Sequence, residues 1–145
     1  MSQVSQVSRV SSTPDQQVEP TTATVGTNLV VLHGVLSRDP EVRTLPSGDE
    51  LVAYEVTVPR PDGPAESAPV VWIDPPRRRA SLATGDSVVV VGRVRRRFVR
   101  AAGTTQSRTE VRAAKVVRAP SPARGHALVR RTLMGFVEDA GPLHR

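Results

Sequence analysis

The stretch DSVVVVGRVRRRFV (86–99) is the longest strand-like segment of the sequence, and it decides which fold the chain can form. Its run of valines predicts a buried β-strand, and an interior glycine, here Gly92, commonly marks a bend in such a strand. Side chains of a strand alternate between its two faces. One face carries Arg93, Arg95, Arg97 and Val99, and the other carries Val94, Arg96 and Phe98.

The arginine row after Gly92 has two interpretations. If Val94 faces the core, the odd-numbered arginines form an outward ladder with a spacing of about 7 Å, close to that of successive phosphates in an extended strand. Such a ladder suits a nucleic-acid backbone. The alternative is a solvated hairpin stem, whose like charges prevent association with other copies.

Four more segments are predicted to be strands. They are NLVVLHGVL (28–36), ELVAYEVTV (50–58), VVWI (70–73) and RTEVRAAKVVR (108–118). In the second of these, Tyr54 shares a face with three valines and is predicted to lie in the core. The connections are predicted to be a loop with four prolines (59–69), a short helix with a proline entry and a glycine exit (75–85) and a hairpin connection (101–107).

Five strands with one short helix between the third and the fourth match the all-β, Greek-key barrel called the OB-fold. We predict this domain at residues 26–118. Residues 1–25 are rich in Ser, Gln, Thr and Pro and are predicted to be a disordered arm. Residues 119–145 begin as a linker whose prolines and glycine end the regular structure, and continue into HALVRRTLMGFVED (126–139), which has the apolar spacing of a short helix.

Positive charge is concentrated in one third of the chain. The net charge of the 145 residues is +6, but residues 1–76 contain 4 basic and 10 acidic side chains, whereas residues 77–118 contain 12 and 2. Such an excess is typical of a polyanion-binding surface, because arginine offers phosphate a fixed fork of donors. Arginine outnumbers lysine 19 to 1, a bias that GC-rich coding alone also produces.

Two segments resemble the bacterial single-stranded-DNA-binding proteins of the replication type. NLVVLHGVLSRDPEVRTLPSGDELVAYEV (28–56) contains that family's opening Asn28, its strand glycine Gly34, its D-P-E-x-R turn and the P-x-G that follows. LATGDSVVVVGRVRRR (82–97) resembles the family's leucine, turn, β run and G-R-L-x-x-R. The resemblance implies an OB-fold that assembles as a homo-oligomer, a tetramer or a dimer, and binds single-stranded DNA, with RNA as the alternative, without strong sequence preference.

The chain departs from this family at the base-stacking positions and at its C-terminus. Two stacking positions of the family fall on Ser67 and Ile73, and the aromatic after the arginine row falls on Val99. Each base stack contributes about 1–3 kcal/mol, so their loss predicts weaker, arginine-dominated and salt-sensitive binding. Family members usually end in an acidic, aromatic-containing tip that recruits partner proteins, whereas this chain ends EDAGPLHR, which argues against that recruitment.

Three further residues have a structural and a functional interpretation. Trp72 either packs in the core or contacts nucleic acid, and Phe98 either stacks on a base or caps the barrel. Arg43 either contacts phosphate or pairs with Asp39 or Glu41, and the pairing is favoured. The residues that we predict to contact nucleic acid are Arg43, Trp72, Arg93, Arg95, Arg97, Phe98, Arg100 and Arg112.

Nothing in the sequence indicates catalysis, a cofactor or a metal. The chain has no cysteine, its histidines His33, His126 and His144 are isolated, and no serine has a nucleophile-elbow or P-loop context. No segment resembles a signal sequence or a membrane span, so we expect a cytoplasmic protein. The family resemblance implies that it is bacterial and associated with the nucleoid. We predict a divergent or accessory single-stranded-DNA-binding protein of replication, repair or recombination. The alternative is an OB-fold module that has lost most DNA affinity and binds an acidic protein.

Overall fold

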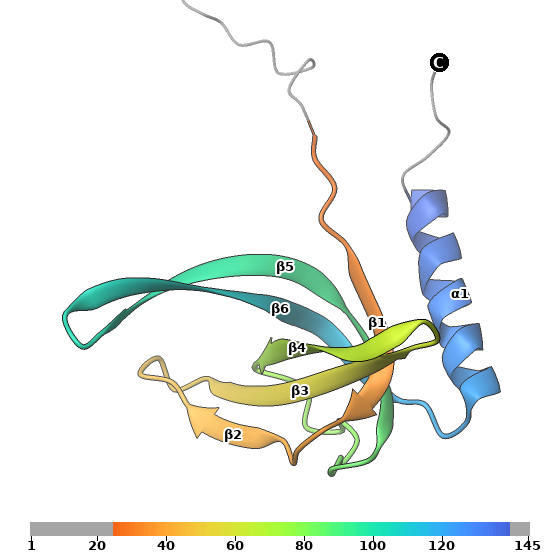
Figure 1. Cartoon of the computed structure of the whole chain (residues 1–145), viewed down its shortest axis with the longest axis horizontal. Helices are drawn as coiled ribbons and strands as arrows, with labels where there is room; N and C mark the ends of the chain where they lie inside the picture. The colour runs from red at the N-terminus through yellow and green to blue at the C-terminus, as the bar shows by residue number, and fades with distance from the viewer. Residues whose placement is uncertain (1–24, 140–145) are drawn as a thin grey trace, which may run out of the picture.

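The computed structural model describes residues 25–139, in which five strands close into a barrel (Figure 1). The elements are β1 (Val30–Leu36), β2 (Glu41–Thr44), β3 (Glu50–Arg60), β4 (Gly63–Ile73), β5 (Ser87–Ala101), β6 (Thr104–Arg118) and α1 (Pro122–Asp139). Strands β1, β5, β6, β4 and β3 pair in that order, and β1 also pairs with β3, which closes the ring. Because β4 and β6 are parallel while the other pairs are antiparallel, the barrel is mixed. The predicted five-stranded barrel is thereby confirmed.

The barrel interior is filled mainly by valines. Val56, Val88 and Val90 are fully buried, and the two aromatic rings in the core belong to Tyr54 and Trp72. The predicted core position of Tyr54 is therefore confirmed. The other members of the core cluster are Leu36, Val52, Val70, Val111, Ala113 and Val116. Fully burying one valine or leucine side chain contributes about 1.5–3 kcal/mol, so this small aliphatic core supplies most of the stability.

The strand glycines permit close approach of neighbouring strands. A Cβ atom at Gly92 would overlap the backbone of Arg112 and Ala113, and one at Gly34 would overlap the backbone carbonyl of Thr57. The register between β5 and β6 also shifts between Val91 and Gly92, which is the signature of a β-bulge. The bend predicted at Gly92 is thus present, and it directs the rest of β5 and β6 away from the barrel as a two-stranded ribbon (Figure 1).

The loop predicted at 59–69 is wrong, because this segment forms the end of a β-hairpin. β3 continues to Arg60 and β4 begins at Gly63. Over most of this segment the strands pair only with each other, and proline is tolerated on a free strand edge because its missing N–H is not needed there. Arg60 holds the turn through ion pairs to Asp62 and Glu66 at 3.4 and 3.0 Å.

The helix predicted at 75–85 is also wrong. Residues 74–86 form an irregular loop with turns at 77–78 and 84–85. A helix of two turns is marginal by itself, and here side chains from elsewhere compete for its backbone groups. The Asp39 carboxylate accepts hydrogen bonds from the backbone N–H and the hydroxyl of Thr84, both at 2.8 Å. Arg118 donates to the Ser81 carbonyl and to Asp86, both at 3.0 Å.

The contacts of this loop are expected to weaken in acid. Hydrogen bonds from the backbone and hydroxyl of Thr84 lower the pKa of Asp39, and the backbone N–H of Ala83, together with Arg118, lowers the pKa of Asp86. Both values lie below those of the unfolded chain, so the stabilisation is present above about pH 3.9 and is lost as the pH falls through the folded values.

We therefore expect Asp39→Asn to be less stable than the wild type at neutral pH, and the two stabilities to converge as the pH falls through the lowered pKa of Asp39. The measurement is the urea midpoint of unfolding as a function of pH, followed by circular dichroism. Two parallel curves down to the lowest pH would contradict the contribution of this carboxylate.

Helix α1 begins earlier than the tail predicted at 126–139. Ser121 caps it, because its hydroxyl accepts a hydrogen bond from the backbone N–H of Arg124 at 3.2 Å. Pro122 occupies the first turn, where its missing N–H costs nothing. The prolines and glycine of 119–125 were predicted to end regular structure, and β6 does end at Arg118. The linker is short, however, because Pro122 already begins α1. The arm predicted at 1–25, apart from Val25, and His144 lie outside the described residues.

Helix α1 packs against β1 through a glycine. A Cβ atom at Gly125 would overlap the imidazole of His33, so any other residue there would force this ring to move. The rings of His33 and His126 lie edge to face, with centroids 5.5 Å apart. The two histidines were predicted to be isolated, and this is wrong because the docking of α1 brings them together.

Candidate nucleic-acid interface

The three arginines of the ladder lie together on the outer face of the barrel. Val70 and Val111 pair in the core, so the next pair, Val71 and Arg112, lies outside. On the ribbon that extends from the barrel, three cross-strand pairs share this side with that pair. They are Arg93 with Arg112, Arg95 with Glu110, and Arg97 with Arg108.

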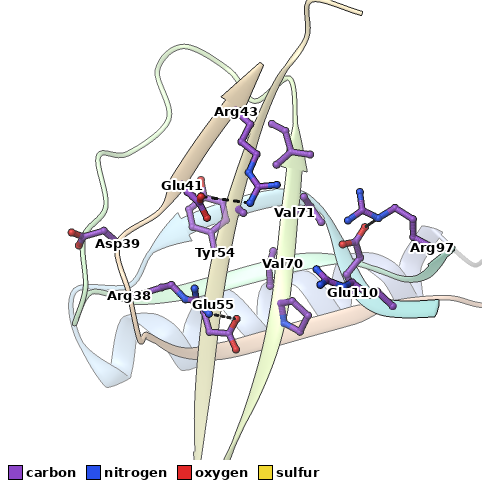
Figure 2. Close-up of a pocket in the computed structure, with 14 residues that line it drawn as sticks. Arg38, Asp39, Glu41, Arg43, Tyr54, Glu55, Val70, Val71, Arg97 and Glu110 are labelled. Carbon is purple, nitrogen blue, oxygen red and sulfur yellow. Dashed lines mark hydrogen bonds and ion pairs between the residues drawn. The ribbon is translucent and has the colours of Figure 1, made fainter. Parts of the chain in front are cut away.

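A groove crosses this outer face between β2 and the β5–β6 ribbon (Figure 2). Figure 2 shows Arg43 and Glu41 on one side and Arg97 with Glu110 on the other. Its floor is formed by small or aliphatic side chains of β3 and β4, including Ala53, Pro69 and Val71. Its charged lining is balanced, with the arginines Arg38, Arg43, Arg97 and Arg108 against the acidic residues Asp39, Glu41, Glu55 and Glu110.

Ion pairs within the groove occupy three of its arginines. Arg43 pairs with Glu41 at 3.5 Å, as favoured from the sequence, and Arg38 pairs with Glu55 at 3.7 Å. Both arginines are largely exposed, so these pairs are weak and a phosphate can displace the carboxylate. The pair of Arg97 with Glu110 at 3.7 Å differs, because the Glu110 side chain is only 10% exposed. Arg97 is thus held by a carboxylate that is largely removed from water.

Four arginines around Glu110 have no such partner. Among the residues that the structure describes, no carboxylate lies within ion-pair distance of Arg93, Arg95, Arg108 or Arg112. Arg93, Arg95 and Arg108 are exposed, and Arg112 is half-buried. These side chains are the donors that the outer face can offer to an anion without first breaking an ion pair.

The opposite face of the ribbon presents a different set of residues. This face carries Val94, Arg96, Phe98 and Arg100. Inside the barrel the same side of β5 faces the core, but these four residues lie on the part that extends past the barrel, so they are exposed. Phe98 is 68% exposed, so the interpretation in which it caps the barrel is wrong. Its ring and the side chain of Arg100 lie on the other side of the ribbon from the arginine ladder.

Trp72 does not reach the surface of the groove. Its side chain is 8% exposed and belongs to the core cluster, opposite Val52 on the neighbouring strand. The adjacent residue Val71 is the one that lines the groove. Trp72 was included among the predicted nucleic-acid contacts, and we remove it from that set because its ring is packed inside the barrel.

The three positions where the related family carries stacking aromatics lie on the outer face. Ser67 and Ile73 share the side of β4 that presents Val71, and Val99 shares the side of β5 that presents the ladder. The hydroxyl of Ser67 instead forms a hydrogen bond with the hydroxyl of Thr57 across the hairpin, with 2.8 Å between the two oxygens. At these three positions the outer face therefore has aliphatic or hydroxyl side chains in place of aromatic rings.

Arg108 was missed from the sequence because the hairpin connection predicted at 101–107 is present but much shorter than predicted. The ribbon closes through a two-residue turn at Ala102 and Gly103, with φ of 52° and 79°. Positive φ at both central residues defines the two-residue turn whose twist matches that of the flanking strands. Alanine rarely adopts positive φ, and the Asn-Gly pair that usually signals such a turn is not present here. With the turn known, pairing across the ribbon puts Arg108 opposite Arg97.

Within residues 25–139, no three side chains of the His, Asp or Glu type are grouped so that they could hold a metal ion. No helix in this range is long and apolar enough to cross a membrane.

An OB-like barrel with a charged groove and an arginine-bearing ribbon on one outer face defines a binding protein for an extended polyanion. The chain belongs to the single-strand binding protein family, whose family model matches residues 27–119. This confirms the family resemblance of the sequence, and membership implies single-stranded DNA binding by a family that is normally non-enzymatic. No individual curated protein matches the chain.

Proposed function

We propose that this protein binds single-stranded DNA without sequence preference through the outer face of its β5–β6 ribbon. The observation that carries this proposal is the group of four arginines without ion-pair partners, Arg93, Arg95, Arg108 and Arg112. Each offers a fork of donors to phosphate. Two of the three cross-strand pairs, Arg93 with Arg112 and Arg97 with Arg108, are doubly basic. Arg43 and Arg97 are secondary contacts, because each must first leave a carboxylate.

The binding is mainly electrostatic. No aromatic ring occupies the three compared stacking positions, so the contribution of about 1–3 kcal/mol for each stacked base is absent there. The carboxylates of the groove also repel phosphates, which favours a path along the ribbon over one across the groove floor. Phe98 and Arg100 contribute only if the strand passes around the ribbon to its other face. Such a protein binds more weakly and more salt-sensitively than one with stacking rings.

The finer parts of this proposal follow from the family. Residues 26–118 act as the binding domain, and the protein forms a dimer or a tetramer. It acts as an accessory or divergent protein of replication, repair or recombination in the bacterial cytoplasm, because its set of base-stacking residues is degenerate. Phosphate contacts do not distinguish the two sugars, so RNA is bound by the same face unless the 2′-hydroxyl is excluded.

The test is binding of the full chain to poly(dT) over a series of salt concentrations. If about five phosphates are neutralised, log K falls with log salt with a slope near −3.5. A duplex of equal length serves as the control and is expected to bind more weakly. Absence of poly(dT) binding at low salt by a folded protein would overturn the proposal.

The second candidate function is a protein-interaction module. The observation that favours it is the balanced charge of the groove, in which Glu41, Glu55 and Glu110 already neutralise three arginines. Such a module would present the arginine ladder to an acidic partner protein. Failure to bind poly(dT) at low salt, together with normal folding, is the result that favours this second function.

A further inference from the structure

Helix α1 lies on the same outer face as the arginine ladder, at the other end of the ribbon. Under the helix, three residues lie side by side across neighbouring strands: His33 of β1, Val89 of β5 and Val117 of β6. His33 contacts Gly125 of α1, and Val117 lines a hollow with the helix. The helix thus covers the base of the ribbon, while the turn at 102–103 forms its far end (Figure 1). All of α1 lies beyond residue 119, where the family match ends.

Basic residues connect these two ends along the outer face. From the helix outward, the cross-strand pairs are Val91 with Lys115, Arg93 with Arg112, Arg95 with Glu110, and Arg97 with Arg108. Only Glu110 interrupts the series, and it is paired with Arg97. Lys115 is exposed and fills the interval between the ladder and the helix. From Arg97 on the ribbon to Val89 at the helix, strand β5 spans about 26 Å at 3.3 Å per residue.

The flank of α1 next to the ribbon carries two further arginines. Arg124 and Arg131, two helical turns apart, line the hollow that also contains Val117 and Arg118. Arg118 is engaged by Asp86 and Ser81, whereas neither helix arginine has an ion-pair partner within residues 25–139. Helix stability does not explain Arg124, because a cation in the first turn opposes the helix dipole and no acidic residue offsets it there.

We propose that α1 extends the DNA-binding surface, so that single-stranded DNA that leaves the ribbon past Lys115 continues over Arg124 and Arg131. This rests on the proposed function of the ribbon. An extended strand covers about 26 Å with roughly four nucleotides, and the helix holds one or two more, which agrees with the range of about 4–16 nucleotides for a single OB-fold. The helix thus determines how many nucleotides one protomer holds.

The experiment compares Arg124→Gln/Arg131→Gln with the wild type on oligothymidines of four and of twelve nucleotides over a salt series. For the longer oligomer, the slope of log K against log salt becomes less steep by about 1.4, and affinity falls on the order of tenfold. For the four-nucleotide oligomer, which the ribbon holds alone, binding is unchanged.

Two variants control for charge and for the helix. Arg77→Gln/Arg78→Gln removes the same charge from the loop 74–86 and is expected to leave the slope unchanged. Arg130→Gln alters the other flank of α1, beside His126 and Leu133, and is also expected to have no effect. Far-ultraviolet circular dichroism verifies that each variant retains its helix.

The outcomes separate the helix from the ribbon. If the wild type binds neither oligomer, the proposed function of the ribbon fails. If the wild type binds the longer oligomer and Arg124→Gln/Arg131→Gln binds it with an unchanged slope, the role of α1 is overturned while the ribbon stands. Equal weakening for both oligomers, or an equal effect of Arg77→Gln/Arg78→Gln, also overturns it, because the arginines would then act only through net charge or folding.

Discussion

Replacing Arg93, Arg95 and Arg97 together with Ser is expected to abolish most of the affinity for single-stranded DNA. Three phosphate contacts are lost, so the slope of log K against log salt becomes less steep by about 2, and binding at low salt weakens on the order of a hundredfold. Loss of Arg97 also frees the largely buried carboxylate of Glu110, which then repels phosphate. The measurement is fluorescence anisotropy of a labelled oligothymidine at several salt concentrations.

The same strand provides a matched control. Arg96→Ser/Arg100→Ser removes charges from the opposite face of the ribbon and is expected to have a much smaller effect. If this control weakens binding as much as the triple variant, DNA follows the face that carries Phe98. If neither variant changes affinity, the arginine row is only a solvated stem. Arg97→Ser/Glu110→Gln separates the lost contact from the freed carboxylate.

Replacing Trp72 with Ala is expected to lower the free energy of unfolding by about 3–5 kcal/mol. The side chain is 8% exposed within a core that otherwise consists largely of aliphatic residues, so no neighbour can fill the space that it leaves. Urea unfolding followed by circular dichroism measures the change. Trp72 is the single tryptophan of the chain, so its fluorescence also reports unfolding of the wild type.

Trp72→Phe tests whether this residue acts through packing alone. It retains a ring in the core and is expected to keep both the fold and most of the DNA affinity, with a smaller loss of stability than the alanine variant. A Trp72→Ala protein that unfolds at the wild-type midpoint but no longer binds DNA would contradict this assignment and restore Trp72 to the set of contacts.

Much of the barrel could be predicted because its strands have strong local patterns. Alternation in 50–58 placed Tyr54 in the core, and the valine run before Gly92 identified the longest strand together with its bend. The failures arose where pairing with distant residues decided the conformation. The prolines of 59–69 lie in a hairpin with free edges. Residues 75–85 do not form the predicted helix, because Asp39 and Arg118 form hydrogen bonds with their backbone.

The candidate site was predictable only in part. Alternation within one strand correctly put the ladder arginines on one face and Phe98 on the other. It could not reveal the cross-strand partners, because these depend on a two-residue turn in which Ala102 has an unusual positive φ. Arg108 and Glu110 therefore entered the site only once the register was known. The two-turn spacing of Arg124 and Arg131 was visible in the sequence, but their neighbours were not.

The sequence by itself determined the family, the barrel class and the segment that carries the positive charge, because motifs, alternation and composition are properties of adjacent residues. Only the tertiary structure decided which arginines are free, since an ion pair such as Arg97 with Glu110 joins residues from two strands. It also decided that Trp72 is core and that α1 lies at the end of the ladder. These depend on which residues approach through space, and Gly125 permits that approach for the helix by leaving room for His33.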